Sequence, residues 1–403
     1  MSERYDYIIV GAGLAGASAV EGVREVDTSG QVLLLGAEPD RPYHRPPLSK
    51  KLWFGDEKVE GVFVHDADFY AEQGVKLGLG TQVVKLDPRA RTVTTADGSQ
   101  YQYGKLLLAT GGVPRRLAIP GGDIPEICYF RTRQDYLALR AGAVPGAHAL
   151  VIGGGFIGSE LACALAHAQV QVTMLFPSSH VCSRVFPHGL GDALGARLSA
   201  RGITILAFDK PISIHHTGHR FHTETEGGRK IESDLLVAGV GVSPATELAL
   251  QGGLRVDGGI CVNQYLQTSA PDIYAAGDNA VFPSALLGRP VRVEHWDNAL
   301  NQGRLAGKNM AGAHAPYAYS PYFFSDLFDF GYEAVGDVDA RHETFADWQQ
   351  TNEKGVIYYL ENALVRGVML CNVWGQVDAA RALIMAQTRG SAEALRGAIP
   401  FGD

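Results

Sequence analysis

The chain carries the same strand–turn–helix pattern twice, and this repeat constrains its fold more than any other feature. The first copy is YIIVGAGLAGASAVEGVRE from Tyr7, and the second is ALVIGGGFIGSELACALAH from Ala149. In each copy an apolar run leads into a G-x-G-x-x-G turn and then into an Ala-rich helix. One such motif is a weak signal, but two in the correct context, about 140 residues apart, are a strong one. The sequence therefore predicts two domains that each bind a dinucleotide.

Each glycine of the motif has its own physical role. The first makes the turn, the second lets the backbone approach a pyrophosphate, and the third lets the helix pack close to the strand. The phosphates then face the N-terminus of the helix. The predicted binding residues are Gly11, Gly13, Leu14, Ala15 and Gly16 in the first loop, and Gly153, Gly155, Phe156, Ile157 and Gly158 in the second.

Composition excludes several classes of function. The net charge of -8 and the lack of a basic run argue against nucleic acid as the main partner. The five cysteines show no C-x-x-C or metal spacing, so the sequence indicates no redox-active disulfide and no metal site. We expect a cytoplasmic protein, because the start of the chain lacks the features of a signal peptide and no stretch reads as a membrane span. Any redox chemistry must then come from a bound cofactor.

Two dinucleotides in one chain imply an electron donor and an acceptor, and the simplest pairing is a nicotinamide with a tightly held flavin. Two further segments support flavin in the first unit, namely KLLLATGGVP (105–114) and DIYAAGDNA (272–280). Both look like buried strands that end in small residues. The second offers Asp278 at a strand end, where a side chain can meet a ligand. We therefore expect FAD in the first unit and NAD(P)H in the second.

The composition changes from Pro316 onwards. Aromatic residues cluster in PYAYSPYFFSDLFDFGYEAVG, and GVIYYLENALVRGVMLCNVWG has the pattern of strand, turn and strand. The Ala- and Arg-rich segment DAARALIMAQTRG then predicts a helix, so this region is expected to form an α+β domain. The predicted boundaries are 1–112 and 245–315 for the FAD domain, 113–244 for the NAD(P)H domain, and 316–403 for the C-terminal domain.

Together these residues resemble the pyridine-nucleotide:flavin oxidoreductases of the glutathione-reductase fold. Within them the chain is most similar to apoptosis-inducing factor and its bacterial relatives, then to the ferredoxin reductases of Rieske dioxygenase systems and to putidaredoxin reductase. The most specific stretches are RPPLSKKLWF (45–54), GGGFIGSELACAL (153–165), LFPSSHVCSRVFP (175–187), VEHWDNA (293–299), YFFSDLFDFGYEAVG (322–336) and KGVIYYLENALVRGVMLCNVW (354–374). The resemblance implies an α/β fold with two Rossmann-like domains and a C-terminal α+β domain.

The resemblance also implies a redox site. Lys50 is expected close to the reactive edge of the isoalloxazine, where a cation would stabilise the reduced ring. Glu160, expected in the first turn of its helix, is implied to pair with Lys50; a simpler role is to complement the helix dipole. Phe156 matches an aromatic that shields the flavin. The remaining FAD contacts implied are Arg45, Val83, Ala109, Thr110, Gly111, Arg131, Asp278 and Trp296, with Glu38 as the ribose acid because Ala37 stands where the family often has one.

The coenzyme preference is left open by the second unit. Phe176 stands where most relatives have a Glu that binds the adenosine ribose and repels a 2′-phosphate. Ser178 can bind ribose or phosphate, and Arg184 matches a basic position that could hold a 2′-phosphate. NADH is the expected donor and NADPH is the alternative. Gly241, Glu294 and His295 are expected to complete the nicotinamide side.

The predicted reaction moves hydride from the nicotinamide to flavin N5 and then electrons to an external acceptor, either an iron–sulfur protein such as a ferredoxin or a small molecule such as a quinone. The rival hypothesis is a redox-responsive protein resembling apoptosis-inducing factor, whose long-lived reduced flavin–NAD⁺ complex controls dimerisation or partner binding. The long insertion of that protein is absent here, since only residues 338–353 separate YEAVG from KGVIYY. A homodimer is expected by analogy alone.

Overall fold

The computed structural model describes residues 3–402, which form two compact units. Unit 1 comprises residues 3–44, 60–113 and 243–321, and unit 2 comprises residues 45–59, 114–242 and 322–402. Unit 2 therefore joins the second glycine loop, the RPPLSK segment and the aromatic C-terminal region in one body. The predicted three-domain division stays a prediction. Two of the boundaries between the units fall within β7 (Gly112–Pro114) and β15 (Val242–Pro244), which pair with each other.

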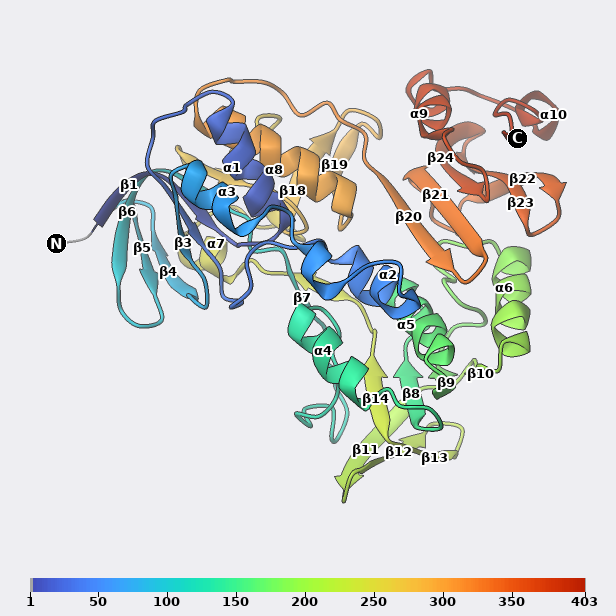
Figure 1. The fold of residues 1–403 in the computed structure, drawn as a ribbon. Helices are drawn as coiled ribbons and strands as arrows, with labels where there is room; N and C mark the ends of the chain where they lie inside the picture. The colour runs from blue at the N-terminus through green and yellow to red at the C-terminus, as the bar shows by residue number, and fades with distance from the viewer. Residues whose placement is uncertain (1–2, 403) are drawn as a thin grey trace. The chain divides into compact units, whose positions relative to one another are not determined.

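Unit 1 is built on a sheet whose strands run in the order β3-β2-β1-β6-β5-β4, with β17 added beside β6. Figure 1 shows β1, β3, β4, β5 and β6 of this sheet in blue to cyan. β1, β2, β3, β6 and β17 pair in parallel, whereas β4 and β5 are antiparallel. The bounds are β1 Glu3–Val10, β2 Val32–Leu35, β3 Val75–Gly78, β4 Val83–Asp87, β5 Thr92–Thr95, β6 Gln100–Leu108 and β17 Ile273–Ala275. A smaller sheet joins β16 (Ile260–Cys261), β18 (Ala280–Ser284) and β19 (Arg289–Arg292).

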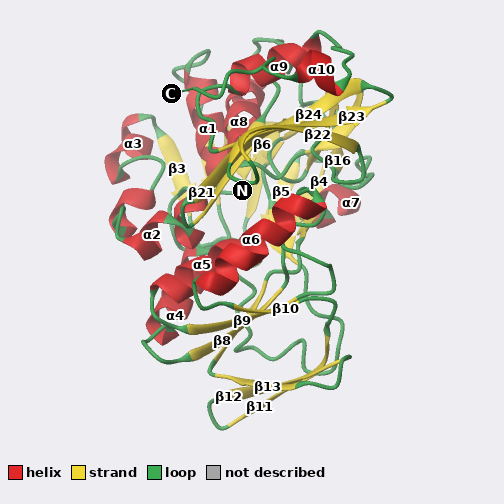
Figure 2. Cartoon of the chain, turned by 90° about the vertical axis from the view of Figure 1, so that its right-hand side faces the viewer, coloured by secondary structure: helices red, strands yellow, loops and turns green. Residues whose placement is uncertain are grey.

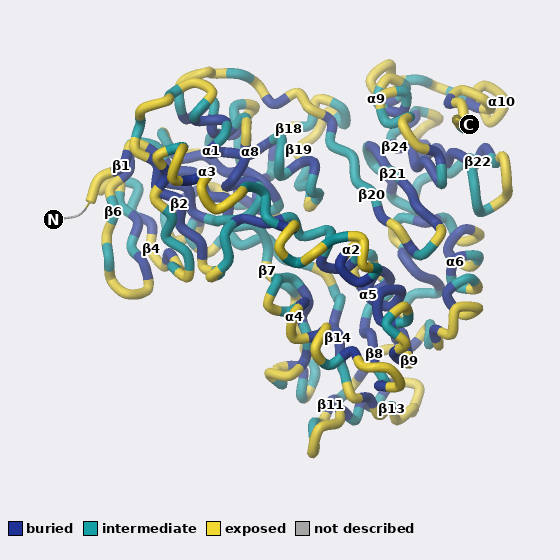
Figure 3. The backbone as a smooth tube through the Cα atoms, in the orientation of Figure 1, coloured by how far each residue is buried: buried dark blue, intermediate teal, exposed yellow. Residues whose placement is uncertain are grey.

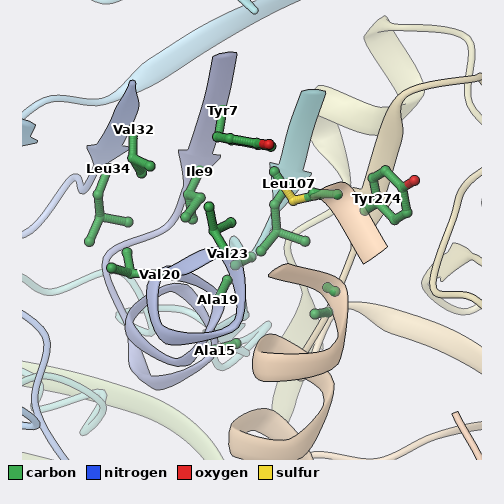
Figure 4. Packing of buried hydrophobic residues seen from close by; sticks show 14 of the residues in the cluster. Tyr7, Ile9, Ala15, Ala19, Val20, Val23, Val32, Leu34, Leu107 and Tyr274 are labelled. Carbon is green, nitrogen blue, oxygen red and sulfur yellow. The ribbon is translucent and has the colours of Figure 1, made fainter. Parts of the chain in front are cut away.

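Two helices, α1 (Leu14–Arg24) and α8 (Trp296–Met310), pack against each other and against this sheet. Figure 4 shows α1 side chains such as Val23 pointing towards Ile9 and Leu107 of the strands. A second apolar cluster on the sheet includes Ala249 of α7 (Glu247–Gln251). The short helices α3 (Ala67–Glu72) and η2 (Val59–Val62) lie in the connection from β2 to β3.

The parallel sheet of unit 2 has the order β10-β9-β8-β14. Figure 2 shows α5 and α6 on one side of these strands and the antiparallel ribbon β11-β12-β13 on the other. The bounds are β8 His148–Ile152, α5 Phe156–His167, β9 Gln171–Leu175, α6 His188–Ala200, β10 Thr204–Leu206, β11 Pro211–Thr217, β12 Arg220–Thr225, β13 Lys230–Ser233 and β14 Leu235–Ala238. α4 (Arg133–Gly142) begins with a capping box between Thr132 and Asp135.

The C-terminal segment of unit 2 is an antiparallel sheet in the order β20-β21-β24-β23-β22, with α9 (Val377–Met385) packed against β21 and β24. The bounds are β20 Tyr322–Leu327, β21 Phe330–Gly336, β22 Glu343–Gln350, β23 Lys354–Glu361 and β24 Leu364–Cys371. The predicted strand–turn–strand pattern and the helix after it are thus confirmed. α10 (Ala392–Leu395) follows, and Figure 3 shows the inner strands of this sheet as buried.

Residues 45–54 form two short consecutive helices of unit 2, η1 (Pro46–Ser49) and α2 (Lys51–Phe54). Both pack against α5. Among the described residues, every helix is too short or too polar to cross a bilayer.

The close packing of α1 on α8 gives a first testable prediction. A Cβ added to Gly307 of α8 would lie 2.1 Å from the carbonyl oxygen of Ala19 in α1, so Gly307→Ala must force the two helix backbones apart. We expect a loss of about 2 kcal/mol or more in the free energy of unfolding, measured by denaturant titration. The control is Gly189→Ala in α6, where a Cβ meets no atom within 4 Å and the change should be neutral or slightly stabilising. Equal stability of the two variants would contradict this account of the packing.

Candidate functional site

The first glycine loop, in unit 1, leaves open space at its middle glycine alone. Gly11 has a φ of +119°, and a Cβ there would lie 2.0 Å from the carbonyl oxygen of Ala109. A Cβ on Gly16 would lie 2.0 Å from the oxygen of Gly11, whereas one on Gly13 would meet no atom within 4 Å. α1 then begins without a side-chain cap or an acid in its first turn. Its first N–H groups are therefore available to an anion, and this cradle fits a pyrophosphate.

The second glycine loop, in unit 2, has the same distribution of space. Gly153 has a φ of +116°, and a Cβ there would lie 2.3 Å from the oxygen of Gly239. A Cβ on Gly158 would lie 2.1 Å from the oxygen of Gly153, and one on Gly155 would meet nothing within 4 Å. α5 also starts without a side-chain cap. The two loops therefore offer the same fit to a dinucleotide phosphate.

The ends of β6 and β17 are tied together beside the first loop. Asn279 is fully buried, and its amide donates to the Leu108 carbonyl at 3.0 Å and to the Thr110 hydroxyl at 2.9 Å. The Thr110 hydroxyl donates in turn to the Ala245 carbonyl at 2.7 Å. This network fixes the backbone on both sides of Thr110 and next to Asp278. Sequence reasoning missed Asn279, and its one signal was its place directly after Asp278.

The predicted ribose acid, Glu38, follows β2 in unit 1. The hydroxyl of buried Tyr43 donates to the Glu38 carboxylate at 2.5 Å. Val83, a predicted FAD contact, begins β4 and is buried. The hydrogen bond from Tyr43 positions the Glu38 carboxylate. That Glu38 binds the ribose stays a prediction.

The residues from Glu294 to Trp296 mark the start of α8, also in unit 1. The Trp296 indole N–H donates to His44 Nδ1 at 2.9 Å, which fixes the ring. Burial lowers the pKa of His295 to about 4, against the opposing effect of the Asp278 carboxylate, so this histidine is neutral at physiological pH. Arg292 pairs with Glu294 and also donates to the Asp278 carbonyl at 3.0 Å.

The Lys50–Glu160 pair lies in unit 2. Lys50 Nζ is 3.1 Å from Glu160 Oε1, and Glu160 is only 5% exposed. The Ser49 hydroxyl donates to Glu160 Oε2 at 2.6 Å, and the Ser325 hydroxyl donates to Oε1. Sequence reasoning expected Lys50 beside Glu160 but missed both serines. Ser49 and Ser325 lie within the family-specific stretches 45–54 and 322–336, but no pattern in the sequence distinguishes their hydroxyls.

The expected position of Glu160 in the first turn of its helix is wrong. α5 begins at Phe156, and its first turn contains no acid. The carboxylate therefore belongs to the second turn and is held by groups from η1 and β20 instead of by the helix end. A role as complement to the helix dipole does not account for this geometry, because the dipole effect is confined to the first turn.

The segment that carries Lys50 is fixed by its own sequence. Pro46 and Pro47 start the short helix η1, and the Trp53 indole donates to the Leu48 carbonyl at 2.7 Å. Lys50 then joins η1 to α2. Arg45, just before η1, donates to the Arg131 carbonyl at 2.5 Å. The structure thus brings two predicted FAD contacts, Arg45 and Arg131, into contact within unit 2.

Phe156, the predicted shield, begins α5 and is half-buried. Its ring centroid lies 5.4 Å from that of Phe323 in β20 and 6.4 Å from that of Tyr332 in β21. The adjacent Ile157 is exposed. The C-terminal sheet therefore packs against Phe156, the first residue of the helix that follows the second glycine loop.

Phe176 packs beneath the second glycine loop. A Cβ on Gly154 would lie 2.7 Å from Cγ of the Phe176 ring, which is 1% exposed. The Ser178 hydroxyl donates to the His180 carbonyl at 3.1 Å, and Arg184 is exposed. Gly241 has a φ of +103° and accepts the N–H of Arg115 at 2.9 Å.

A cavity of about 270 Å³ opens beside Phe176 at the end of β9. Ser179 and His180 line it together with Asp192 from α6. His188 Nδ1 lies 2.8 Å from the Asp192 carboxylate, one helical turn away. An acid thus lies near the end of β9 but comes from α6, a different element of the sequence.

The cysteines are free thiols at all five positions, each of which is described. Burial raises the pKa of Cys128, Cys163 and Cys182 to about 12. Such thiols hold their protons at neutral pH and are poor nucleophiles.

Two known protein families match most of the chain. The model of the pyridine nucleotide-disulphide oxidoreductase family matches residues 5–303, and the C-terminal model of mitochondrion-associated apoptosis-inducing factor matches residues 306–353. Rubredoxin-NAD(+) reductase of Pseudomonas putida is 34% identical over 89% of this chain and 94% of its own length. The ferredoxin reductase subunit of 5,5'-dehydrodivanillate O-demethylase from Sphingobium sp. (strain NBRC 103272 / SYK-6) is 33% identical over 96% of this chain and 94% of its length.

Among solved structures, the covalent putidaredoxin reductase–putidaredoxin complex superimposes with a TM-score of 0.90 and 30% identity, covering 98% of this chain and 95% of the matched chain. The predicted glutathione-reductase-type fold and the predicted cofactors are thereby confirmed. The chain belongs to the pyridine nucleotide-disulphide oxidoreductase family and is an FAD-dependent NAD(P)H oxidoreductase.

Proposed function

We propose that this oxidoreductase passes electrons from NADH to a small iron–sulfur protein. The observation that carries the proposal is the pair of glycine loops in one chain, each with open space at its middle glycine, Gly13 and Gly155. Relatives named as a rubredoxin reductase and as the ferredoxin reductase subunit of an O-demethylase support an iron–sulfur acceptor over a quinone. Bound FAD would supply the chemistry that accepts a hydride and passes electrons on to the acceptor.

The chain's own groups bind and orient the two dinucleotides. The two loops hold pyrophosphates at the N-termini of α1 and α5, where backbone N–H groups favour negative charge. Lys50 offers a positive charge that is only 12% exposed, so water screens it weakly. The buried, protonated thiols take no part in the transfer. A homodimer remains a prediction from the resemblance.

NADH is proposed as the donor because of Asp192. Asp192 is one of the residues that line the cavity beside Phe176, and a negative charge there opposes the 2′-phosphate of NADPH. This proposal places the acid that selects NADH on α6, in place of the Glu that most relatives carry at the strand end.

The proposed function is tested by anaerobic titration of the yellow protein with NADH, followed by turnover with a [2Fe–2S] ferredoxin or a rubredoxin in excess. We expect rapid bleaching of the flavin and catalytic reduction of at least one carrier. A charge-transfer band that persists, with slow turnover on every acceptor including a quinone, would contradict the proposal and favour the redox-responsive hypothesis, for which the match of residues 306–353 is the specific observation.

The second loop is tested by Gly155→Val. Because a Cβ at Gly155 meets no protein atom within 4 Å, the variant should fold and retain FAD. The added side chain fills the space left for the pyrophosphate, so the Kd for NADH should rise about tenfold or more, as measured by stopped-flow reduction at varied NADH. Gly189→Ala in α6, which also faces open space, is the control. Unchanged NADH affinity in Gly155→Val would place the coenzyme elsewhere.

The coenzyme preference is tested by Asp192→Ser and, separately, by Arg184→Ala. We expect Asp192→Ser to lower the ratio of kcat/KM for NADH to that for NADPH by about tenfold, because it removes the opposing charge. Arg184→Ala should leave that ratio unchanged. If Arg184→Ala abolishes use of NADPH while Asp192→Ser has no effect, Arg184 holds a 2′-phosphate and the proposed preference is wrong.

A further inference from the structure

We propose that Ser49 and Ser325 form a serine clamp that positions Glu160 against Lys50, and that β20 thereby helps to tune the redox site. The proposal rests on the proposed function, because it assigns the Lys50–Glu160 pair to that site. It adds two positioning residues and gives the C-terminal segment a direct part in the chemistry.

The clamp is defined by the donors around one buried carboxylate. Glu160 Oε2 accepts the Ser49 hydroxyl at 2.6 Å. Oε1 accepts the Ser325 hydroxyl and also faces Lys50 Nζ at 3.1 Å. A buried carboxylate is costly unless hydrogen bonds compensate for the water it loses. The two hydroxyls supply that compensation, so Lys50 is not the sole group that stabilises the charge.

The two hydroxyls are held on separate elements and shielded from solvent. Ser49 ends η1 and is 3% exposed, and Ser325 lies in β20 and is 2% exposed. Ser325 pairs in register with Tyr332 of β21, whose side chain is fully buried. Because both hydroxyls are shielded, water does not replace Glu160 as their hydrogen-bond acceptor. Their donation therefore fixes the orientation of the carboxylate plane.

β20 also contacts the lysine. Lys50 Nζ lies 3.4 Å from the Phe324 carbonyl oxygen and 4.8 Å from the centroid of the Phe324 ring. An ammonium group carries three protons, and the Glu160 and Phe324 oxygens take two of them. Within the described part of the chain, these contacts leave the third proton for a ligand. Adjacent residues of β20, Phe324 and Ser325, thus hold both members of the pair.

The clamp raises the positive electrostatic potential that reaches the flavin. Without the Ser325 hydroxyl, Oε1 would have Lys50 as its one remaining partner. The carboxylate would then draw the ammonium closer and cancel more of its charge, because the ion pair is screened weakly in a buried site. Less positive potential would reach the flavin, so its midpoint potential would fall and hydride acceptance would slow.

The test compares Ser325→Ala with the wild-type holoenzyme in two measurements. One is the midpoint potential of the flavin by dithionite titration against reference dyes, and the other is the limiting rate of flavin reduction by NADH in stopped flow. We expect a more negative potential and a limiting rate about tenfold lower, with the Kd for NADH unchanged. Ser325→Thr retains the hydroxyl and suits a strand, so it should restore both values.

Two further serine variants complete the test. Ser49→Ala removes the other half of the clamp and should lower the potential in the same direction. Ser233→Ala removes a buried hydroxyl of the same unit that has no hydrogen-bond partner among the described residues, and it should match wild type. Potentials and rates in Ser325→Ala and Ser49→Ala that equal those of Ser233→Ala would overturn the clamp, as would a Thr variant as impaired as the Ala variant. If NADH fails to reduce the wild type, the proposed function fails, and the dithionite titration still decides on the clamp.

Discussion

Direct contact between backbones, with no Cβ between them, is the constraint on which the structure depends. At the first loop, Gly11 lies against Ala109 and Gly16 against Gly11. At the second loop, Gly153 and Gly158 make the equivalent contacts. These contacts bring each helix N-terminus close to its strand, and that proximity creates the anion cradle. The fold and the phosphate sites are therefore products of one packing requirement, and a side chain at any of these four positions would damage both.

A second constraint is the burial of charge in unit 2. A carboxylate as enclosed as that of Glu160 requires donors on both oxygens. The donors come from η1 and β20, which lie far from α5 in the sequence and meet it through this group. The polar requirement of one side chain thus organises three elements around Lys50, while apolar packing such as that of Phe156 on Phe323 supports them.

The sequence predicted those parts of the protein that depend on local pattern. The two glycine loops and the C-terminal hairpin follow from short local motifs, whereas the approach of Lys50 to Glu160 was implied by the family resemblance. Ser49, Asn279, Asp192 and Ser325 were missed because their roles depend on tertiary contacts that leave no period in the chain. The turn assigned to Glu160 was wrong because the helix begins at Phe156, and helix ends depend on caps that sequence reasoning locates poorly.

The path of the chain has a consequence for biosynthesis. Unit 1 is interrupted twice by segments of unit 2, and its strand β17 and helix α8 come from the last third of its residues. Domains usually fold one after another as they leave the ribosome. Here the N-terminal sheet must wait for residues 273–310, and the donors of Glu160 are complete only when residue 325 has emerged. Folding is therefore expected to be largely post-translational, and a nascent chain that stalls before β20 would lack the Ser325 hydroxyl that donates to Glu160, even with both glycine loops already made.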